Sequence, residues 1–193
     1  MPIEVDVEGR LKEIAEATFA VARENGVGAV SYRSVAKMLG GSTTIVTNYL
    51  PTRAALLHNA VDHIFRTWHG EMAETIERSA PGDHLRTLAL WSCTTEPADL
   101  ILRHMFIHAL AEITGPVAML GELRQDADEH RLALMQAALQ DGFSEPDSIV
   151  DAIFLICRGF YLSTVESRES WPDDRAASAI EAILGLAGRP RDR

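Results

Sequence analysis

Short polar side chains that can hydrogen-bond to DNA bases follow a pair of glycines in the first third of the chain. Four of them come after Gly40-Gly41: Thr43, Thr44, Thr47 and Asn48. An amide side chain can pair with adenine, and a threonine methyl can contact the methyl group of thymine. Groups that suit a phosphate or guanine lie on both sides of this segment, namely Ser31, Arg33, Lys37, Ser42, Tyr49 and Arg53. These ten residues predict a DNA-binding surface.

The distribution of charge favours a polyanionic partner for the same segment. Residues 25–61 contain no Asp or Glu, although the 193-residue chain has a net charge of −10. Residues 1–61 carry six basic and six acidic side chains, so residues 62–193 supply the whole negative charge. Phosphate binding needs a local positive field, not a basic protein as a whole. We therefore expect the N-terminal part to be the end that meets nucleic acid.

Helical periodicity and its interruptions predict an all-α protein. A helix from near Gly9 ends at Asn25-Gly26, a short helix follows the N-cap Ser31, and a third spans about 43–49 before Pro51. The two short helices, separated by a glycine turn, form a helix-turn-helix. A long helix is expected over about 53–79. Pro and Gly breaks then separate five further helices, over about 84–94, 97–113, 116–140, 147–167 and 173–187.

This order of elements resembles the tetracycline-repressor (TetR) family of bacterial regulators over about residues 10–60. The matching residues are Phe19, Gly26, Ser31, Val35-Ala36-Lys37-Met38-Leu39-Gly40, Ser42, Tyr49-Leu50-Pro51 and Arg53-Ala54-Ala55-Leu56-Leu57. The family usually has Lys or Arg, Gly and an aromatic residue where this chain has Thr43, Thr44 and Thr47. The third helix, expected to enter the major groove, therefore carries no cation.

The resemblance implies a helix-turn-helix DNA-binding domain over 1–52, joined by the long helix to a helical ligand-binding and dimerisation domain over 53–193. The partners that it implies are a palindromic double-stranded DNA operator, a small-molecule effector and a second copy of the chain. Binding of the effector would change the spacing of the two DNA-binding heads.

Bulky apolar residues and two histidines are the candidates for an effector site between helices: Trp68, Trp91, Met105, His104, His108 and Phe154. The alternative is that the apolar residues are ordinary core. His104 and His108 have the i, i+4 spacing of a metal pair. No Glu-x-x-His or Cys-x-x-Cys pattern accompanies them, so neither a metal site nor a cofactor is predicted.

The segment from Ile149 to Val165 is apolar on nearly every side. A helix that is apolar all round is buried all round, which indicates either a subunit interface or a central core helix. By resemblance, this helix and the last one pair with their copies as a four-helix bundle. The predicted interface residues are Ile153, Cys157, Phe160, Tyr161, Ile180, Ile183 and Leu184.

Several classes of protein are disfavoured. The sequence has none of the short motifs of nucleophilic, metal-dependent or nucleotide-binding enzymes. It has two cysteines, a polar start and no apolar run of 18 residues, which favours a cytoplasmic protein without a membrane span. We therefore expect a ligand-responsive repressor that a small apolar effector releases from its operator. The alternative is a small-molecule or metal-binding helical protein without an operator.

Overall fold

The computed structural model describes residues 6–112 and 117–187, and every regular element in these ranges is helical. The predicted all-α class is confirmed. The chain divides into two compact units: unit 1 is Met1–Thr67 with Pro97–Leu120, and unit 2 is Trp68–Glu96 with Gly121–Arg193. Helix α4 (Arg53–Arg78) belongs to both. This division falls inside α4, and the helix over residues 97–112 packs in unit 1. The domain boundary expected after residue 52 stays a prediction.

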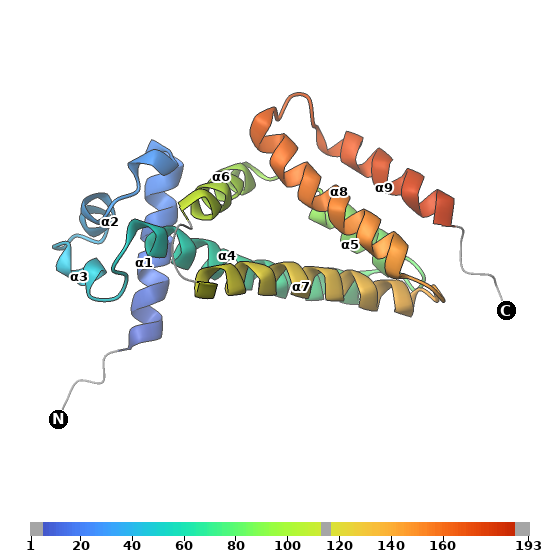
Figure 1. The fold of residues 1–193 in the computed structure, drawn as a ribbon, viewed down its shortest axis with the longest axis horizontal. Helices are drawn as coiled ribbons and strands as arrows, with labels where there is room; N and C mark the ends of the chain where they lie inside the picture. The colour runs from blue at the N-terminus through green and yellow to red at the C-terminus, as the bar shows by residue number, and fades with distance from the viewer. Residues whose placement is uncertain (1–5, 113–116, 188–193) are drawn as a thin grey trace. The chain divides into compact units, whose positions relative to one another are not determined.

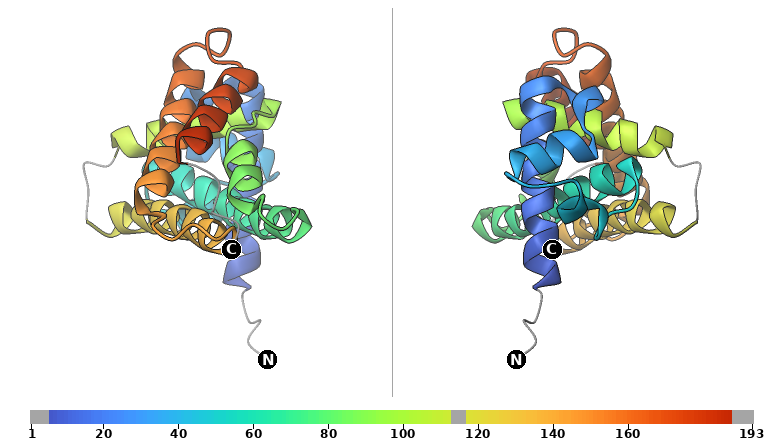
Figure 2. Two further views of the ribbon diagram at one scale, coloured as in Figure 1. Left: turned by 90° about the vertical axis from the view of Figure 1, so that its right-hand side faces the viewer. Right: turned by 90° about the vertical axis from the view of Figure 1, so that its left-hand side faces the viewer.

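Unit 1 places the helix-turn-helix against two longer helices (Figure 1). It contains α1 (Val7–Asn25), the 3-10 turn η1 (Val27–Ala29), α2 (Tyr32–Met38), α3 (Thr44–Thr47), the first part of α4 and α6 (Pro97–Glu112). Figure 2 shows α1, α2 and α3 from two further sides. Apolar residues spaced along these helices are buried, among them Ile14, Val21, Val35, Val46 and Leu56.

Helix α1 begins at a capping residue and is hydrogen-bonded to α4. The Asp6 carboxylate accepts a hydrogen bond of 2.8 Å from the backbone N–H of Gly9, which satisfies one of the amides left unpaired at a helix start. The helix therefore starts at Val7, two residues before the expected start. Asn59 on α4 donates to the backbone oxygen of Leu11 at 2.9 Å and fixes α1 to α4.

Unit 2 contains the end of α4, α5 (His84–Ser92), α7 (Val117–Gln140) from Gly121 on, α8 (Asp147–Glu166) and α9 (Asp173–Ala187). Helices α8 and α9 run antiparallel and lie side by side (Figures 1 and 2). The Asp141 carboxylate, just after α7, accepts the backbone N–H groups of His84 and Leu85 at 3.1 and 2.8 Å. It thereby caps α5 with a residue distant in sequence.

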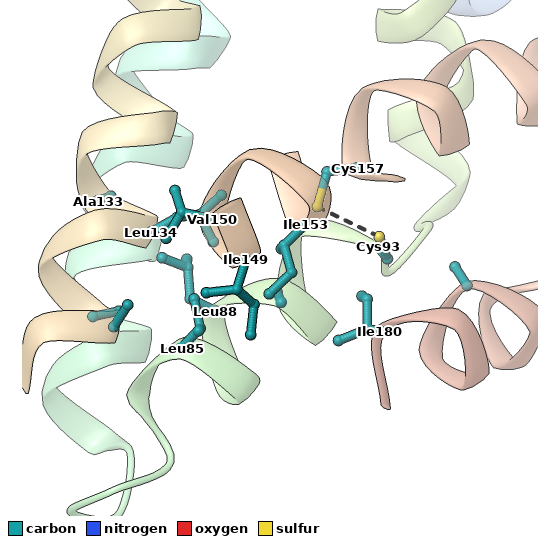
Figure 3. Packing of buried hydrophobic residues seen from close by; sticks show 14 of the residues in the cluster. Leu85, Leu88, Cys93, Ala133, Leu134, Ile149, Val150, Ile153, Cys157 and Ile180 are labelled. Atoms are coloured by element: carbon teal, nitrogen blue, oxygen red, sulfur yellow. Dashed lines mark hydrogen bonds between the residues drawn. The ribbon is translucent and has the colours of Figure 1, made fainter. Parts of the chain in front are cut away.

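The core of unit 2 is an apolar cluster contributed by α5, α7, α8 and α9 (Figure 3). Leu88, Leu134, Ile153 and Ile180 are fully enclosed in it. Within the described residues, α8 alone has the length and mean hydropathy, 1.5 over its window, that would let a helix cross a membrane. Core helices of globular proteins meet the same criterion, and one face of α8 lies in this cluster.

Candidate nucleic-acid interface

A reciprocal pair of serine contacts defines the start of α2. The Ser31 hydroxyl accepts from the backbone N–H of Ser34 at 3.1 Å, and the Ser34 hydroxyl oxygen accepts from the backbone N–H of Ser31 at 2.9 Å. This capping box satisfies two amides at the helix start. The Ser34 hydroxyl also lies 2.8 Å from the backbone oxygen of Ala29, which connects α2 to the preceding turn. Ser31 therefore has a structural role, and its side chain stays at the surface.

A glycine turn leads from α2 to α3. Gly40 has φ of 71°, in the left-handed region that favours glycine, and the N–H of Gly41 donates to Ala36 at 2.9 Å. Val46 is fully buried, so it anchors the single turn of α3 in the core of unit 1. The opposite side of this turn is polar and exposed, and it presents Ser42, Thr43, Thr44, Thr47 and Asn48.

The three predicted cations of this surface have two different environments. Arg33 and Lys37 are four residues apart on α2, are exposed, and form no ion pair among the described residues. Arg53 instead donates from Nε to the backbone oxygen of Val30 at 2.9 Å and from an Nη atom to Val27 at 2.8 Å. The structure thus places Arg33 and Lys37 where a phosphate could reach them, whereas Arg53 fastens α4 to the turn before α2. Tyr49 is half-buried.

The predicted effector residues are divided between the two units. Trp68, Trp91 and Phe154 belong to unit 2 and are half-buried. His104, Met105 and His108 belong to unit 1. Met105 is fully buried, whereas both histidines are exposed, and Nδ1 of His104 lies 2.7 Å from the backbone oxygen of Leu100. The predicted set of six therefore does not form one cluster within either unit.

Unit 2 contains a polar cluster that the sequence pattern did not reveal. Nε2 of His130 on α7 lies 3.0 Å from the Ser92 hydroxyl on α5, and both residues are buried. Arg158 on α8 donates to Asp126 on α7 at 3.0 Å. Nε2 of His69 on α4 lies 3.4 Å from the same carboxylate. These side chains come from α4, α5, α7 and α8 and span positions 69 to 158, so the packing of four helices brings them together.

Burial decides the protonation state of His130. Desolvation, followed by the nearby charges of Arg158 and His69, lowers its pKa from 6.5 to about 4. The imidazole is thus neutral near pH 7, and its ring meets Phe154 edge-on at 5.7 Å. The guanidinium carbon of Arg158 also lies over the Phe154 ring, 5.2 Å from its centre. The ring centres of Trp68 and Tyr161 are 6.5 Å apart. Polar groups surrounded by aromatic rings are features of small-molecule sites in helical domains.

Two other features bear on ligand binding. A groove of about 730 Å³ in unit 1 runs between the start of α1 and the middle of α4, where it is lined by residues such as Lys12, His63 and Arg66. This groove contains none of the predicted effector residues. Among the residues that the structure describes, no three His, Cys, Asp or Glu side chains are grouped so that they could hold a metal ion.

The predicted interface residues are mostly inside the protomer. Ile153, Cys157, Phe160 and Ile180 are 0 to 3% exposed, because their face of α8 and α9 packs on α5 and α7 in the core of unit 2. These four are core residues of the protomer, as the alternative of a central core helix predicts, whereas they were expected at the subunit interface. Tyr161, Ile183 and Leu184 are half-buried at the edge of that core. The outer face instead exposes Leu155, Leu162 and Leu186.

Comparison of the chain with known proteins gives one similar curated sequence. It is 42% identical over 57 residues to the HTH-type transcriptional regulator PksA of Bacillus subtilis (strain 168). The match covers 30% of this chain and spans only 28% of that relative's length. No protein-family model matches the chain.

Solved structures are similar over nearly the whole chain. A transcriptional regulator from Rhodococcus sp. Rha1 superposes with a TM-score of 0.74 at 20% identity, covering 92% of this chain and 95% of that one. A Rhodococcus protein assigned to the TetR family gives 0.70 at 16% identity, covering 93% and 98%. NalD, the secondary repressor of the MexAB-OprM multidrug efflux pump in Pseudomonas aeruginosa, gives 0.60 at 16% identity, covering 97% and 98%. The resemblance in fold to TetR-family regulators is confirmed.

Proposed function

We propose that this chain, which has the fold of TetR-family transcriptional regulators, is a cytoplasmic, ligand-responsive DNA-binding repressor. The observation that carries the proposal is the exposed polar surface of α2 and α3. It combines hydrogen-bonding side chains on α3 with the two cations of α2, in a segment free of acidic residues. A short helix behind a glycine turn is the geometry with which helix-turn-helix proteins enter the major groove.

In this proposal, α3 reads the bases and α2 holds the backbone. Thr43, Thr44, Thr47 and Asn48 would contact base edges, and Arg33 and Lys37 would contact phosphate or guanine. Tyr49 and Ser42 border this surface and would add hydroxyl contacts to phosphate. Since α3 has no cation, affinity would depend strongly on the two cations of α2.

We propose that the effector binds in unit 2. The neutral, buried His130 and the Asp126–Arg158 pair would orient a ligand, while Trp68, Phe154 and Tyr161 would supply apolar contacts. Helix α4 is common to both units, so a ligand that prefers one position of α4 would act on unit 1 as well. Two recognition helices in a dimer must fit half-sites about 34 Å apart, and a change in their spacing would release the operator.

The second candidate is a helical protein that binds a small molecule or metal and has no operator. The observation that favours it is the absence of any cation from the α3 sequence Thr44–Thr47. A protein of this kind would bind its ligand in unit 2 and show no preference among DNA sequences.

An electrophoretic mobility shift with the DNA flanking the coding region, compared with random DNA of equal length, separates the two candidates. Sequence-selective retention is expected. Replacing Arg33 with Ala should weaken operator binding by about 1–3 kcal/mol if it contacts a guanine. Removing Arg33 and Lys37 together in both protomers of a dimer removes four cations, so the slope of log affinity against log salt should flatten by about 3 to 4.

The matched control is Arg78→Ala, which removes an exposed cation that pairs with Glu74 at the end of α4. It should bind operator like the unaltered protein. Equal binding of operator and random DNA, unchanged in the Arg33→Ala and Lys37→Ala double variant, would favour the second candidate and remove α2 from the interface.

A further inference from the structure

The only two cysteines of the chain lie side by side in the core of unit 2. Cys93 follows the last turn of α5 and Cys157 lies in the middle of α8, 64 residues later. Their sulfur atoms are 3.7 Å apart, and the two side chains are 2% and 0% exposed (Figure 3). The packing of α5 on α8 therefore brings the two thiols into contact. No sequence motif links these two cysteines.

We propose that Cys93 and Cys157 form a redox modification site, which a small hydroperoxide converts into an intramolecular disulfide. A disulfide has a sulfur–sulfur distance of about 2.05 Å, so the two sulfur atoms must approach by about 1.7 Å. Rotation of the two side chains together with small helix shifts can cover this distance, since helices shift by about 1–2 Å in switching transitions.

The positions of the two residues assign them different roles. Cys93 is the C-cap of α5, and the next residue, Thr94, is exposed. Helix ends open locally at low cost, so a small oxidant reaches Cys93 first. Cys157 has helix on both sides and packs beside Ile153 and Phe160. Its hydrogen bond with Cys93 and its burial raise the pKa of the Cys157 thiol well above its ordinary value, which keeps this thiol protonated.

The chemistry is balanced with one peroxide and the two thiols. The sulfur of Cys93 attacks one oxygen of hydrogen peroxide, the O–O bond breaks, and the released hydroxide takes up the proton of the Cys93 thiol as water. The sulfur of Cys157 then attacks the resulting sulfenic acid. The S–S bond forms, the S–O bond breaks, and hydroxide leaves with the proton of Cys157 as a second water. The two thiols are oxidised and the peroxide is reduced to two waters.

A peptide map of the full chain tests this site. The folded protein is treated with hydrogen peroxide, quenched with catalase, unfolded in the presence of N-ethylmaleimide, digested and analysed by mass spectrometry. We expect a linked pair of peptides that contain Cys93 and Cys157, without maleimide and lighter than the sum of the two thiol peptides by two hydrogen atoms. Dithiothreitol should convert the pair back to two thiols.

Two further measurements accompany the map. The oxidised protein should melt at a higher temperature than the reduced protein, because the crosslink restricts the unfolded chain, and dithiothreitol should reverse the change. The variants Cys93→Ala and Cys157→Ala should show neither the linked peptides nor the shift in melting temperature. If either variant does not fold, the peptide map of the unaltered protein still decides the question.

Several results would overturn the site. Both cysteines could carry maleimide after peroxide, each could be oxidised separately to sulfinic acid, or the link could join two chains. Linkage found only in protein that was unfolded before the peroxide was added would also refute it. All these readouts are covalent, so they do not depend on whether the chain binds an operator.

Discussion

Arg53 shows how a single side chain can resemble a phosphate ligand in the sequence and have another role in the fold. It follows the helix-turn-helix and is one of three charged residues in its segment, which is why a DNA contact was predicted. Its guanidinium instead donates to the backbone oxygens of Val27 and Val30. Buried carbonyl groups need donors. The Val27 oxygen also accepts from the Val30 N–H in the 3-10 turn, and Arg53 supplies a donor to both oxygens.

We expect the change Arg53→Ala to lower the free energy of unfolding by about 1–2 kcal/mol, since two charge-assisted hydrogen bonds of a partly exposed group are lost. Urea unfolding followed by circular dichroism measures this. The change Arg33→Ala removes the same charge from an exposed site of α2 and should alter stability by less than about 0.5 kcal/mol. Equal stability of the two variants would contradict the role given to Arg53.

His130 makes stability depend on pH through its lowered pKa of about 4. In the unfolded chain this imidazole binds a proton near pH 6.5, whereas in the folded chain it stays neutral down to about pH 4. Between these values the unfolded state holds more protons, so unfolding becomes more favourable as the pH falls. The stabilisation is fully present above about pH 6.5 and is lost on acidification towards about pH 4, which amounts to about 3 kcal/mol.

The measurement compares urea unfolding of the unaltered protein and of His130→Gln at about pH 7.5 and about pH 4.5. Most of the loss of stability due to protonation of His130 falls between these two pH values. Carboxylates contribute equally to both proteins, so the difference between the two pH dependences isolates the imidazole. The unaltered protein should lose more stability on acidification than the variant. Parallel losses would mean that His130 is accessible to protons when folded.

At the scale of elements, the angle between α2 and α3 depends on the backbone of the turn between them. Gly40 has positive φ, and the Gly41 amide closes the turn onto Ala36. A Cβ at Gly40 meets no other atom within 4 Å, so the strain of a larger residue there is conformational and not a clash. The prediction for this element therefore separates backbone strain from packing.

We expect Gly40→Ala to cost about 1–2 kcal/mol in the free energy of unfolding, the usual penalty for an L-residue in the left-handed region. Operator binding should weaken as well, since α3 would change its direction. Gly28→Ala is the matched control, because a Cβ at Gly28 also has open space but its φ lies outside the left-handed region. It should change stability by about 0.5 kcal/mol or less. Calorimetric melting of the two variants gives the comparison.

At the scale of the whole molecule, we propose that a second copy of the chain docks on the outer face of α8. Leu155 and Leu162 are seven residues apart, and they are 67% and 52% exposed. Side chains two helical turns apart lie on one face of a helix. Leu186 on α9 is also exposed, at 84%. The inner face of the same helix supplies core residues such as Phe160.

Sedimentation should find a dimer at micromolar concentration and a folded monomer for Leu155→Glu, because burying an unpaired carboxylate in the interface is unfavourable. Phe160→Glu puts the same charge into the core of the protomer, and we expect it to prevent folding. A monomeric unaltered protein, or a Leu155→Glu variant that remains dimeric, would contradict this interface.

The sequence by itself determined the helices and the position of the helix-turn-helix. Pro51, Gly26 and the Gly40-Gly41 pair interrupt the apolar period, and these local signals act within a few residues, so the observed bounds follow the predicted ones closely. Exposed residues such as Arg33 and Asn48 could be chosen in the same way, because no other element has to cover them. The distribution of charge along the chain was also visible without a structure.

Only the tertiary structure decided which face of an apolar helix meets which neighbour. The apolar residues of α8 indicate that this helix is buried, but they do not show on which face. Ile153 is in the core and Leu155 is at the surface because α5, α7 and α9 pack on one side of α8. The contacts of Ser92 with His130, and of Cys93 with Cys157, join residues 38 and 64 positions apart. Such contacts depend on how the helices cross, and spacing along a single helix carries no information about its neighbours.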